Sequence, residues 1–128
     1  MSTFSDSMPN LYTRDIGAAV AWYRDQLGFI ATYQFPPEGP PSHVELRLGD
    51  SRLALSTYDA VREAGVTPEP GKAFELVVWC DDVDAAVRRL SAVGTPVIVA
   101  PHDHVAGHRR AYVADRDGNL LALVRGSV

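Results

Sequence analysis

The strongest constraint on the fold is an internal duplication. The segment RDIGAAVAWYRDQLGF (residues 14–29) has the same pattern as DDVDAAVRRLSAVGTPV (residues 81–97), at a constant offset of 67 residues. Asp15 matches Asp82, and an Ala-Ala-Val run follows each aspartate after two further residues. Similarity at a fixed spacing is typical of one structural unit that occurs twice in a chain. We therefore expect two copies of the same small fold.

In each copy the residue pattern predicts one helix, which begins at an aspartate and ends near a glycine. Asp15 and Asp82 suit the N-cap position, because a short side-chain oxygen accepts hydrogen bonds from the free amides of the first helical turn. Apolar residues then recur at helical spacing in both copies. Gly28 and Gly94 suit the left-handed conformation that ends many helices, because glycine has no Cβ to clash there.

Strand-like segments surround the two helices and define the fold class. A short β-prone run precedes each helix, at residues 8–13 and 74–80, and three more strands follow it. These later strands are residues 29–35, 43–48 and 52–56 in the first copy and 96–100, 109–114 and 120–124 in the second. The Asp117-Gly118-Asn119 run predicts the hairpin turn between the last two strands. This order predicts an α+β fold of two tandem βαβββ modules with a mostly antiparallel sheet.

The two modules are expected to form one domain over residues 1–128. The first module covers residues 8–57 and the second covers residues 74–125. Residues 58–73 form the predicted linker, because the stretch TPEPGKA is rich in Pro and Gly, and a short helix is expected before it. A chain of 128 residues with 46% hydrophobic content can bury enough apolar surface to fold unaided.

Composition and charge exclude several function classes. The formal net charge is −4 and the sequence has no long basic block, so we expect no nucleic-acid partner. The longest apolar runs are far shorter than the ~18 to 20 residues of a membrane span, and residues 1–7 lack the pattern of a signal peptide. A soluble, cytoplasmic protein without a membrane partner is therefore expected. The single cysteine, Cys80, rules out an internal disulfide and is interpreted as a buried structural thiol.

Three motifs resemble the vicinal oxygen chelate superfamily, which includes glyoxalase I, extradiol dioxygenases and bleomycin resistance proteins. They are RDIGAAVAWYRDQLGF, DRDGNLLAL near the C-terminus, and the opening MPNLYTRDI, which is most similar to bleomycin-resistance-type members. Arg116 stands where the family often has proline. The resemblance implies two modules that form a U-shaped sheet around a pocket, and it implies a homodimer.

The resemblance also implies positions for a divalent metal, because catalytic members hold one with side chains inside the pocket. In this sequence the four ligand positions correspond to Met8, Ala54, Glu75 and Ala122. Metals such as Fe, Mn, Ni or Zn need several convergent N and O ligands, and only Glu75 among these four offers one. We therefore expect no metal site of the family type and no cofactor.

Strand alternation predicts which side chains line the pocket that the resemblance implies. If positions 8 and 75 point inward, every second residue on the same strands does so too. The predicted ligand-binding residues are Asn10, Tyr12, Arg52, Glu75, Trp79 and Tyr112. Aromatic walls with a few polar groups are typical of sites for drug-sized organic molecules. The sequence therefore favours a metal-independent protein that binds and sequesters a small organic ligand such as an antibiotic.

An enzyme of the same superfamily is the alternative interpretation. It would be a lyase, an isomerase or a dioxygenase-like protein that uses a relocated metal or Glu75 as a general base. Glu75 could equally pair with Arg52 or Arg110 or contact a cationic ligand. The sequence has no Gly-x-Ser-x-Gly motif, and Cys80 lacks a supporting pattern, so a nucleophilic hydrolase is not indicated.

Two groups of histidines could contribute to a site. His102, His104 and His108, in PHDHVAGH, could bind zinc, but we favour a polar loop after a strand, because no strand or helix would fix their geometry. His43 alternates with Glu45 along one strand. That spacing fits either a cavity lining or a solvated sheet face opposite apolar residues.

Overall fold

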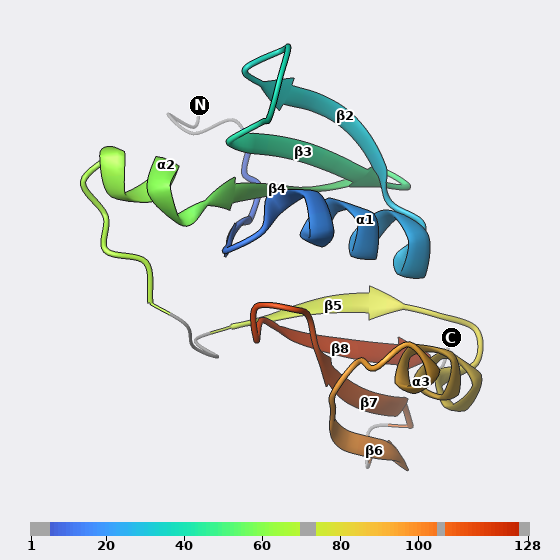
Figure 1. Cartoon of the computed structure of the whole chain (residues 1–128). Helices are drawn as coiled ribbons and strands as arrows, with labels where there is room; N and C mark the ends of the chain where they lie inside the picture. The colour runs from blue at the N-terminus through green and yellow to red at the C-terminus, as the bar shows by residue number, and fades with distance from the viewer. Residues whose placement is uncertain (1–5, 70–73, 105–106, 126–128) are drawn as a thin grey trace, which may run out of the picture. The chain divides into compact units, whose positions relative to one another are not determined.

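The computed structural model describes residues 6–69, 74–104 and 107–125 (Figure 1). The chain divides into two compact units, Met1–Glu69 and Pro70–Val128, and each contains one four-stranded sheet. Both units have the order strand, helix, strand, strand, strand, so the predicted α+β class is confirmed. No helix in these described ranges is long and apolar enough to cross a membrane.

The first unit is a βαβββ module followed by a short helix. Its elements are β1 (Asn10–Thr13), α1 (Ile16–Leu27), β2 (Ile30–Phe35), β3 (His43–Leu48), β4 (Ser51–Thr57) and α2 (Tyr58–Glu63). The sheet order is β1-β4-β3-β2. The β1–β4 pair is parallel, and the other two pairs are antiparallel, as expected for a mostly antiparallel sheet.

The second unit repeats this arrangement. Its elements are β5 (Glu75–Trp79), α3 (Val83–Ala92), β6 (Val97–Asp103), β7 (Arg109–Ala114) and β8 (Leu120–Arg125). The sheet order is β5-β8-β7-β6, with β5 parallel to β8 and the other pairs antiparallel. Each strand therefore has the same neighbours as its counterpart in the first unit.

Both long helices begin at the predicted aspartates. The side chain of Asp15 accepts a hydrogen bond from the Ala18 amide at 3.0 Å, and Asp82 accepts one from the Ala85 amide at 3.0 Å. These bonds satisfy amides that the first helical turn leaves without an intrahelical acceptor. Gly28 follows α1 in the left-handed conformation, with a φ of 87°. The predictions for both N-caps and for this C-cap are confirmed.

Each sheet buries one apolar face against its long helix, and we call the opposite side its far face. In the first unit the fully buried Tyr23 of α1 packs with this apolar face, which α1 contacts through β3 and β4. The buried strand residues on this apolar face include Leu11, Val44, Leu46, Leu53 and Leu55 in the first unit and Val78, Ala111, Val113, Leu121 and Leu123 in the second. Full burial of a leucine or valine side chain contributes about 1.5–3 kcal/mol. The core of each unit therefore lies between helix and sheet.

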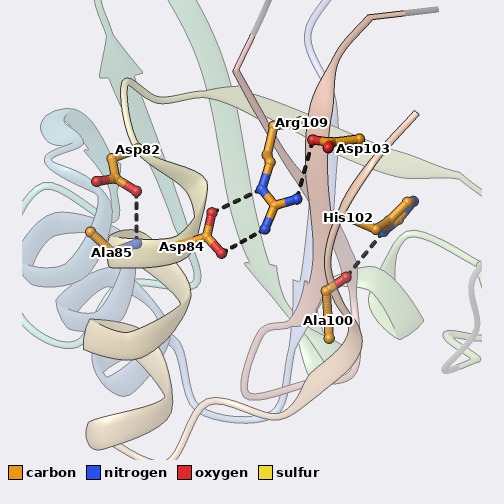
Figure 2. A network of polar contacts seen from close by, with 7 residues as sticks. All are labelled: Asp82, Asp84, Ala85, Ala100, His102, Asp103 and Arg109. Atoms are coloured by element: carbon orange, nitrogen blue, oxygen red, sulfur yellow. Dashed lines mark hydrogen bonds and ion pairs between the residues drawn. The ribbon is translucent and has the colours of Figure 1, made fainter. Parts of the chain in front are cut away.

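An ion-pair network joins α3 to the second sheet (Figure 2). Arg109 on β7 donates to both carboxylate oxygens of Asp84 on α3, at 2.9 and 2.8 Å, and to Asp103 on β6 at 3.1 Å. The hydrogen bond with Arg109 lowers the pKa of the Asp84 carboxyl, and hydrogen bonds to both carboxylates raise the pKa of the Arg109 guanidinium. Because a bidentate pair fixes geometry as well as charge, the network holds the helix to two neighbouring strands.

Strand β6 extends further than predicted. The predicted strand ends at residue 100 and leaves His102 in a loop, whereas β6 continues to Asp103. His102 pairs with Arg110 and Asp103 pairs with Arg109 across the sheet. β6 is an edge strand, which can accommodate Pro101 because one side of such a strand makes no ladder bonds. The polar-loop interpretation is therefore wrong for His102.

Candidate functional site

The far face of the first sheet is a regular array of polar and aromatic side chains. Two neighbouring rows cross the four strands in the order β1, β4, β3, β2. They are Asn10, Ala54, Glu45 and Tyr33, and then Tyr12, Ser56, His43 and Phe35. Directly opposed residues of an antiparallel pair have Cβ atoms about 4.5–5.5 Å apart, so side chains within a row can contact each other.

Four side chains in these rows form a hydrogen-bonded chain, which we call the polar relay. Ser56 donates its hydroxyl proton to Asn10 Oδ1 at 3.0 Å. His43 Nδ1 lies 2.8 Å from Ser56 Oγ, and His43 Nε2 lies 3.4 Å from Glu45 Oε2. Ser56 is buried, whereas the side chains of His43 and Glu45 are 27% and 28% exposed. The polar relay therefore runs from an exposed amide through a buried hydroxyl to a partly exposed carboxylate.

The positions of the protons fix the role of each group in the polar relay. A hydroxyl has one proton, and Ser56 gives it to Asn10, so His43 donates its Nδ1–H to Ser56. The contact between His43 Nε2 and Glu45 is a hydrogen bond only when both imidazole nitrogens carry protons. Because Ser56 is buried and has no adjacent proton acceptor other than an amide oxygen, it does not have the arrangement of an activated nucleophile. Ser56 instead holds Asn10 and His43 in position.

The far face of the second sheet is mainly apolar. Its two corresponding rows are Val77, Ala122, Tyr112 and Val99, and then Trp79, Val124, Arg110 and His102. Trp79 is 66% exposed, and Arg110 Nη1 donates to the Tyr112 hydroxyl at 3.1 Å. Aromatic and aliphatic side chains of this kind can cover the apolar surface of an organic ligand.

The six residues predicted to bind a ligand lie three on each far face. They are Asn10, Tyr12 and Arg52 on the first and Glu75, Trp79 and Tyr112 on the second. Arg52 forms an ion pair with Asp6. Glu75 is exposed and forms no ion pair within the described residues of its unit, so the pair with Arg110 that the sequence left open is not formed. Each sheet therefore brings its own three predicted residues onto one surface.

The positions at which the resemblance places metal ligands do not suit a divalent metal. They are Met8 and Ala54 in the first unit and Glu75 and Ala122 in the second. Ala54 and Ala122 are buried, and a methyl group has no lone pair to give. Across the described ranges, no three His, Cys, Asp or Glu side chains are grouped closely enough to hold a metal ion. The residues present therefore do not fit the metal of the catalytic family members.

The three histidines near the β6–β7 connection do not converge on one point. His102 Nδ1 lies 3.0 Å from the carbonyl oxygen of Ala100, and the rings of His104 and His108 stack with centres 6.1 Å apart. Desolvation lowers the pKa of His104, and the positive charge of Arg110 lowers it further. A low pKa favours the neutral imidazole that metals bind, but these rings form no ligand group within the part of the chain that the structure describes.

A hollow of about 550 Å³ lies on the first unit, and its lining includes no residue of the polar relay. It is lined by Arg14, Thr57, Tyr58, Asp59 and Arg62. The guanidinium carbons of Arg14 and Arg62 lie 5.4 and 5.6 Å from the centre of the Tyr58 ring, which are cation–π distances. Arg62 also pairs with Asp59 at 3.2 Å. This charged hollow contains none of the predicted ligand-binding residues and lacks the apolar lining typical of small-molecule sites.

The polar relay was not predicted, although a local signal in the sequence points to it. His43 and Ser56 are 13 residues apart, and Asn10 and Ser56 are 46 residues apart. The Gly49-Asp50 dipeptide is a two-residue turn between β3 and β4, and such a turn fixes the register of its two strands. Counting outward from this turn places His43 opposite Ser56.

Solved structures with similar folds are known from several bacteria. A glyoxalase/bleomycin resistance protein/dioxygenase family enzyme from Burkholderia phytofirmans PsJN is 26% identical, with a TM-score of 0.79 over 93% of this chain and 96% of that chain. TioX from Micromonospora sp. ML1 is 25% identical, with a TM-score of 0.72 over 94% of this chain and 98% of that chain. Lactoylglutathione lyase from Agrobacterium tumefaciens is 27% identical, with a TM-score of 0.71 over 95% and 94% of the two chains.

The family is settled by a match that spans most of the sequence. No curated protein matches the chain. A family model described as Glyoxalase/Bleomycin resistance protein/Dioxygenase superfamily matches residues 7–123, which include nearly all of both modules. Together with the duplicated βαβββ fold, this match shows that the chain belongs to the glyoxalase/bleomycin resistance protein/dioxygenase superfamily, as its motifs predict.

Proposed function

We propose that the protein binds a small organic molecule without using a metal ion. The observation that carries this proposal is the chemistry of the two far faces. One offers the polar relay beside aromatic rings, and the other offers the exposed Trp79 and the Tyr112–Arg110 pair. Buried alanines occupy two of the family's four metal positions. Aromatic surface with a few polar groups suits a drug-sized compound such as an antibiotic, which the protein would sequester unchanged.

Metal analysis and ligand binding together test this proposal. Protein purified without chelator should contain far less than one transition metal per chain. Some members of a panel of aromatic natural products should raise the melting temperature, because a ligand that binds only the folded state stabilises it. Adding EDTA should leave that increase unchanged. One tightly held transition metal per chain, or a ligand response that EDTA abolishes, would contradict metal-independent binding.

Trp79 allows the second far face to be tested directly. Trp79→Ala should weaken the binding of an aromatic compound from that panel by more than about 1 kcal/mol, as loss of an aromatic anchor often does. Trp22→Phe is the matched control, because Trp22 belongs to α1 and packs edge-on against Tyr23 with ring centres 4.9 Å apart. Unchanged affinity in a folded Trp79→Ala variant would exclude this residue from the binding surface.

An enzyme is the second candidate, favoured by the carboxylate that Glu75 places at a family metal position. Among the similar structures, the one 27% identical to this chain is described as a lactoylglutathione lyase. In this case Glu75 would accept a proton from the substrate as a general base, or a metal held at another position would carry out the chemistry instead. Glu75→Gln separates the candidates. Loss of a reaction with unchanged ligand affinity would favour the enzyme, whereas changed affinity without any measurable turnover favours the binding protein.

We also propose that the protein is a homodimer, which the family resemblance implies. Light scattering coupled to gel filtration should then give a mass close to twice the 13.9 kDa of one chain. A mass equal to one chain at micromolar concentration would contradict the dimer.

A further inference from the structure

The polar relay is not required by the fold, because the second unit is built without it. Asn10 lies opposite Ala54, and in the second unit Val77 lies opposite Ala122 in the same way. Two residues further along the adjacent strand, Ser56 of the first unit is replaced by Val124. The second unit has valines at the Asn10 and Ser56 positions, so it needs no hydrogen-bond partner for a polar side chain at either of them. The polar relay therefore has a role other than folding.

The polar relay leaves two hydrogen-bonding groups without a partner among the described residues. Ser56 occupies the Asn10 oxygen, so the exposed Asn10 amide offers its Nδ2 protons, which no group in the described residues accepts. His43 Nε2 lies 3.4 Å from one oxygen of Glu45, and the other oxygen has no partner in the same ranges. Asn10 and Glu45 belong to one row, on either side of the small Ala54. This row therefore presents a donor and an acceptor at fixed positions.

We propose that this row binds an amide-type group of the ligand, which rests on the proposed binding function and names the ligand's chemistry. The carbonyl oxygen of the ligand accepts from Asn10 Nδ2, and its N–H donates to Glu45. Two strand spacings separate the backbones of these residues by about 10 Å, a gap that an amide with a hydrogen bond at each end can bridge. Tyr33 lies opposite Glu45 in the same row and is 51% exposed, so it can cover an apolar group attached to the amide.

Two other ligand chemistries have to be distinguished from an amide. Arg47 and Arg52 face each other in the next row of the same face, so a carboxylate could bind there. Glu45 beside the Tyr33 ring could instead attract a protonated amine. Four probes of similar size separate these possibilities, because benzamide has both a donor and an acceptor, benzoate is an anion, benzylamine is a cation, and toluene has no polar group.

The experiment is an NMR titration of the ¹⁵N-labelled full chain with each probe at millimolar concentration. Benzamide should bind most tightly and should shift the Asn10 side-chain amide signals. Asn10→Ala and Glu45→Gln should each weaken benzamide binding by about fivefold or more. Ser51→Ala is the control, because Ser51 is an exposed serine on β4, the strand that carries Ser56, and it should leave the affinity unchanged.

Ser56 is tested as a positioning residue with two variants. Ser56→Val introduces the residue found in the second unit, so the chain should fold, while benzamide affinity should fall as in Asn10→Ala. Ser56→Thr keeps the hydroxyl and should restore most of the affinity. Failure of Ser56→Thr to bind better than Ser56→Val would contradict the positioning role.

Several results would overturn the amide site. They are equal or tighter binding of benzoate, benzylamine or toluene, and no detectable binding of benzamide. Benzamide shifts confined to Trp79 and Tyr112 would also overturn it, while leaving the proposed binding function intact. The proposed function itself fails on a different measurement, the metal content of the purified protein.

Discussion

The turn between β7 and β8 gives a sharp test of what holds the second unit together. Asp115 is only 5% exposed, and its carboxylate accepts hydrogen bonds from the backbone amides of Asp117 and Asn119 at 2.9 and 2.8 Å. It also accepts one from the side-chain amide of Asn119 at 2.8 Å. Gly118 completes the turn in the left-handed conformation, with a φ of 85°. Asp115→Ala therefore removes the acceptor of three donors at once.

The expected loss of stability follows from these three bonds. A hydrogen bond to a charged acceptor contributes about 1.5–3 kcal/mol net, but bonds within one network do not add. Water can also reach donors in a turn once the side chain is gone. We therefore expect Asp115→Ala to lower the free energy of unfolding by about 2–4 kcal/mol. Asp115→Asn keeps one oxygen for the backbone amides but faces Asn119 Nδ2 with another donor, so about 1–2 kcal/mol is expected.

Urea unfolding followed by tryptophan fluorescence can measure this loss in the correct unit. The chain has two tryptophans, Trp22 in the first unit and Trp79 in the second. In a Trp22→Phe background, Trp79 alone reports the unfolding of the second unit. Arg116→Ala is the matched control, because this exposed neighbour of Asp115 should change stability by less than about 0.5 kcal/mol. An Asp115→Ala variant as stable as this control would refute the reasoning.

The helix caps, the ion-pair network and the thiol give further tests. Asp15→Ala and Asp82→Ala each remove one N-cap hydrogen bond, so each should lower the free energy of unfolding in urea by about 1 kcal/mol. A variant as stable as the wild type would show that its cap does not stabilise the helix. The hydrogen bond with Arg109 lowers the pKa of Asp84 in the folded chain, so the Asp84–Arg109 pair stabilises the fold at about pH 7. This contribution is lost as the pH falls through the pKa of Asp84 in the folded state. The stability difference between wild type and Asp84→Asn should therefore shrink from about pH 5 to about pH 2, and a constant difference would count against the pair. Burial raises the pKa of Cys80, which lowers the fraction of reactive thiolate, so iodoacetamide at about pH 8 should alkylate the folded chain more slowly than the unfolded chain. Equal alkylation rates would contradict this expectation.

Local signals in the sequence were sufficient to predict the order of the elements and, once the resemblance assigned positions 8 and 75 to the inward side, the faces of the strands. Asp15 and Asp82 mark the helix starts because capping depends on only three neighbouring residues. Alternation places Asn10 and Trp79 on the far faces because successive strand residues point to opposite sides. Both signals act over a few residues, so one sequence is enough to find them.

Features that depend on pairing between distant segments could not be predicted in the same way. The end of β6 is set by its pairing with β7, where Asp103 meets Arg109, and no property of the segment around Pro101 indicates this. The polar relay needs β1 to lie parallel to β4 in one register, which brings Asn10 to Ser56. A shift of that register by one residue would turn Asn10 to the opposite face. The relay is therefore a property of the sheet rather than of any one segment.

The two copies of the module have diverged on one side of the sheet and not on the other. On the helix side, Leu11, Leu53 and Leu55 of the first unit correspond to Val78, Leu121 and Leu123 of the second, and all six are buried and aliphatic. Close packing against a helix tolerates few changes of volume or polarity, which explains this similarity. On the far side, Asn10, Ser56, His43 and Glu45 correspond to Val77, Val124, Arg110 and Tyr112.

This divergence separates the chemistry of the two far faces. His43 and Glu45 carry the polar relay in the first unit, whereas the same positions in the second unit hold the Arg110–Tyr112 hydrogen bond beside exposed Trp79. Since the fold accommodates either set, packing alone does not select one set for one copy. On the proposed binding function, the first far face suits a polar amide group and the second suits an apolar ring system. Asn10→Val combined with Ser56→Val, which gives the first face the valines of the second, should therefore abolish selection for the amide while leaving the affinity for the ring system largely unchanged.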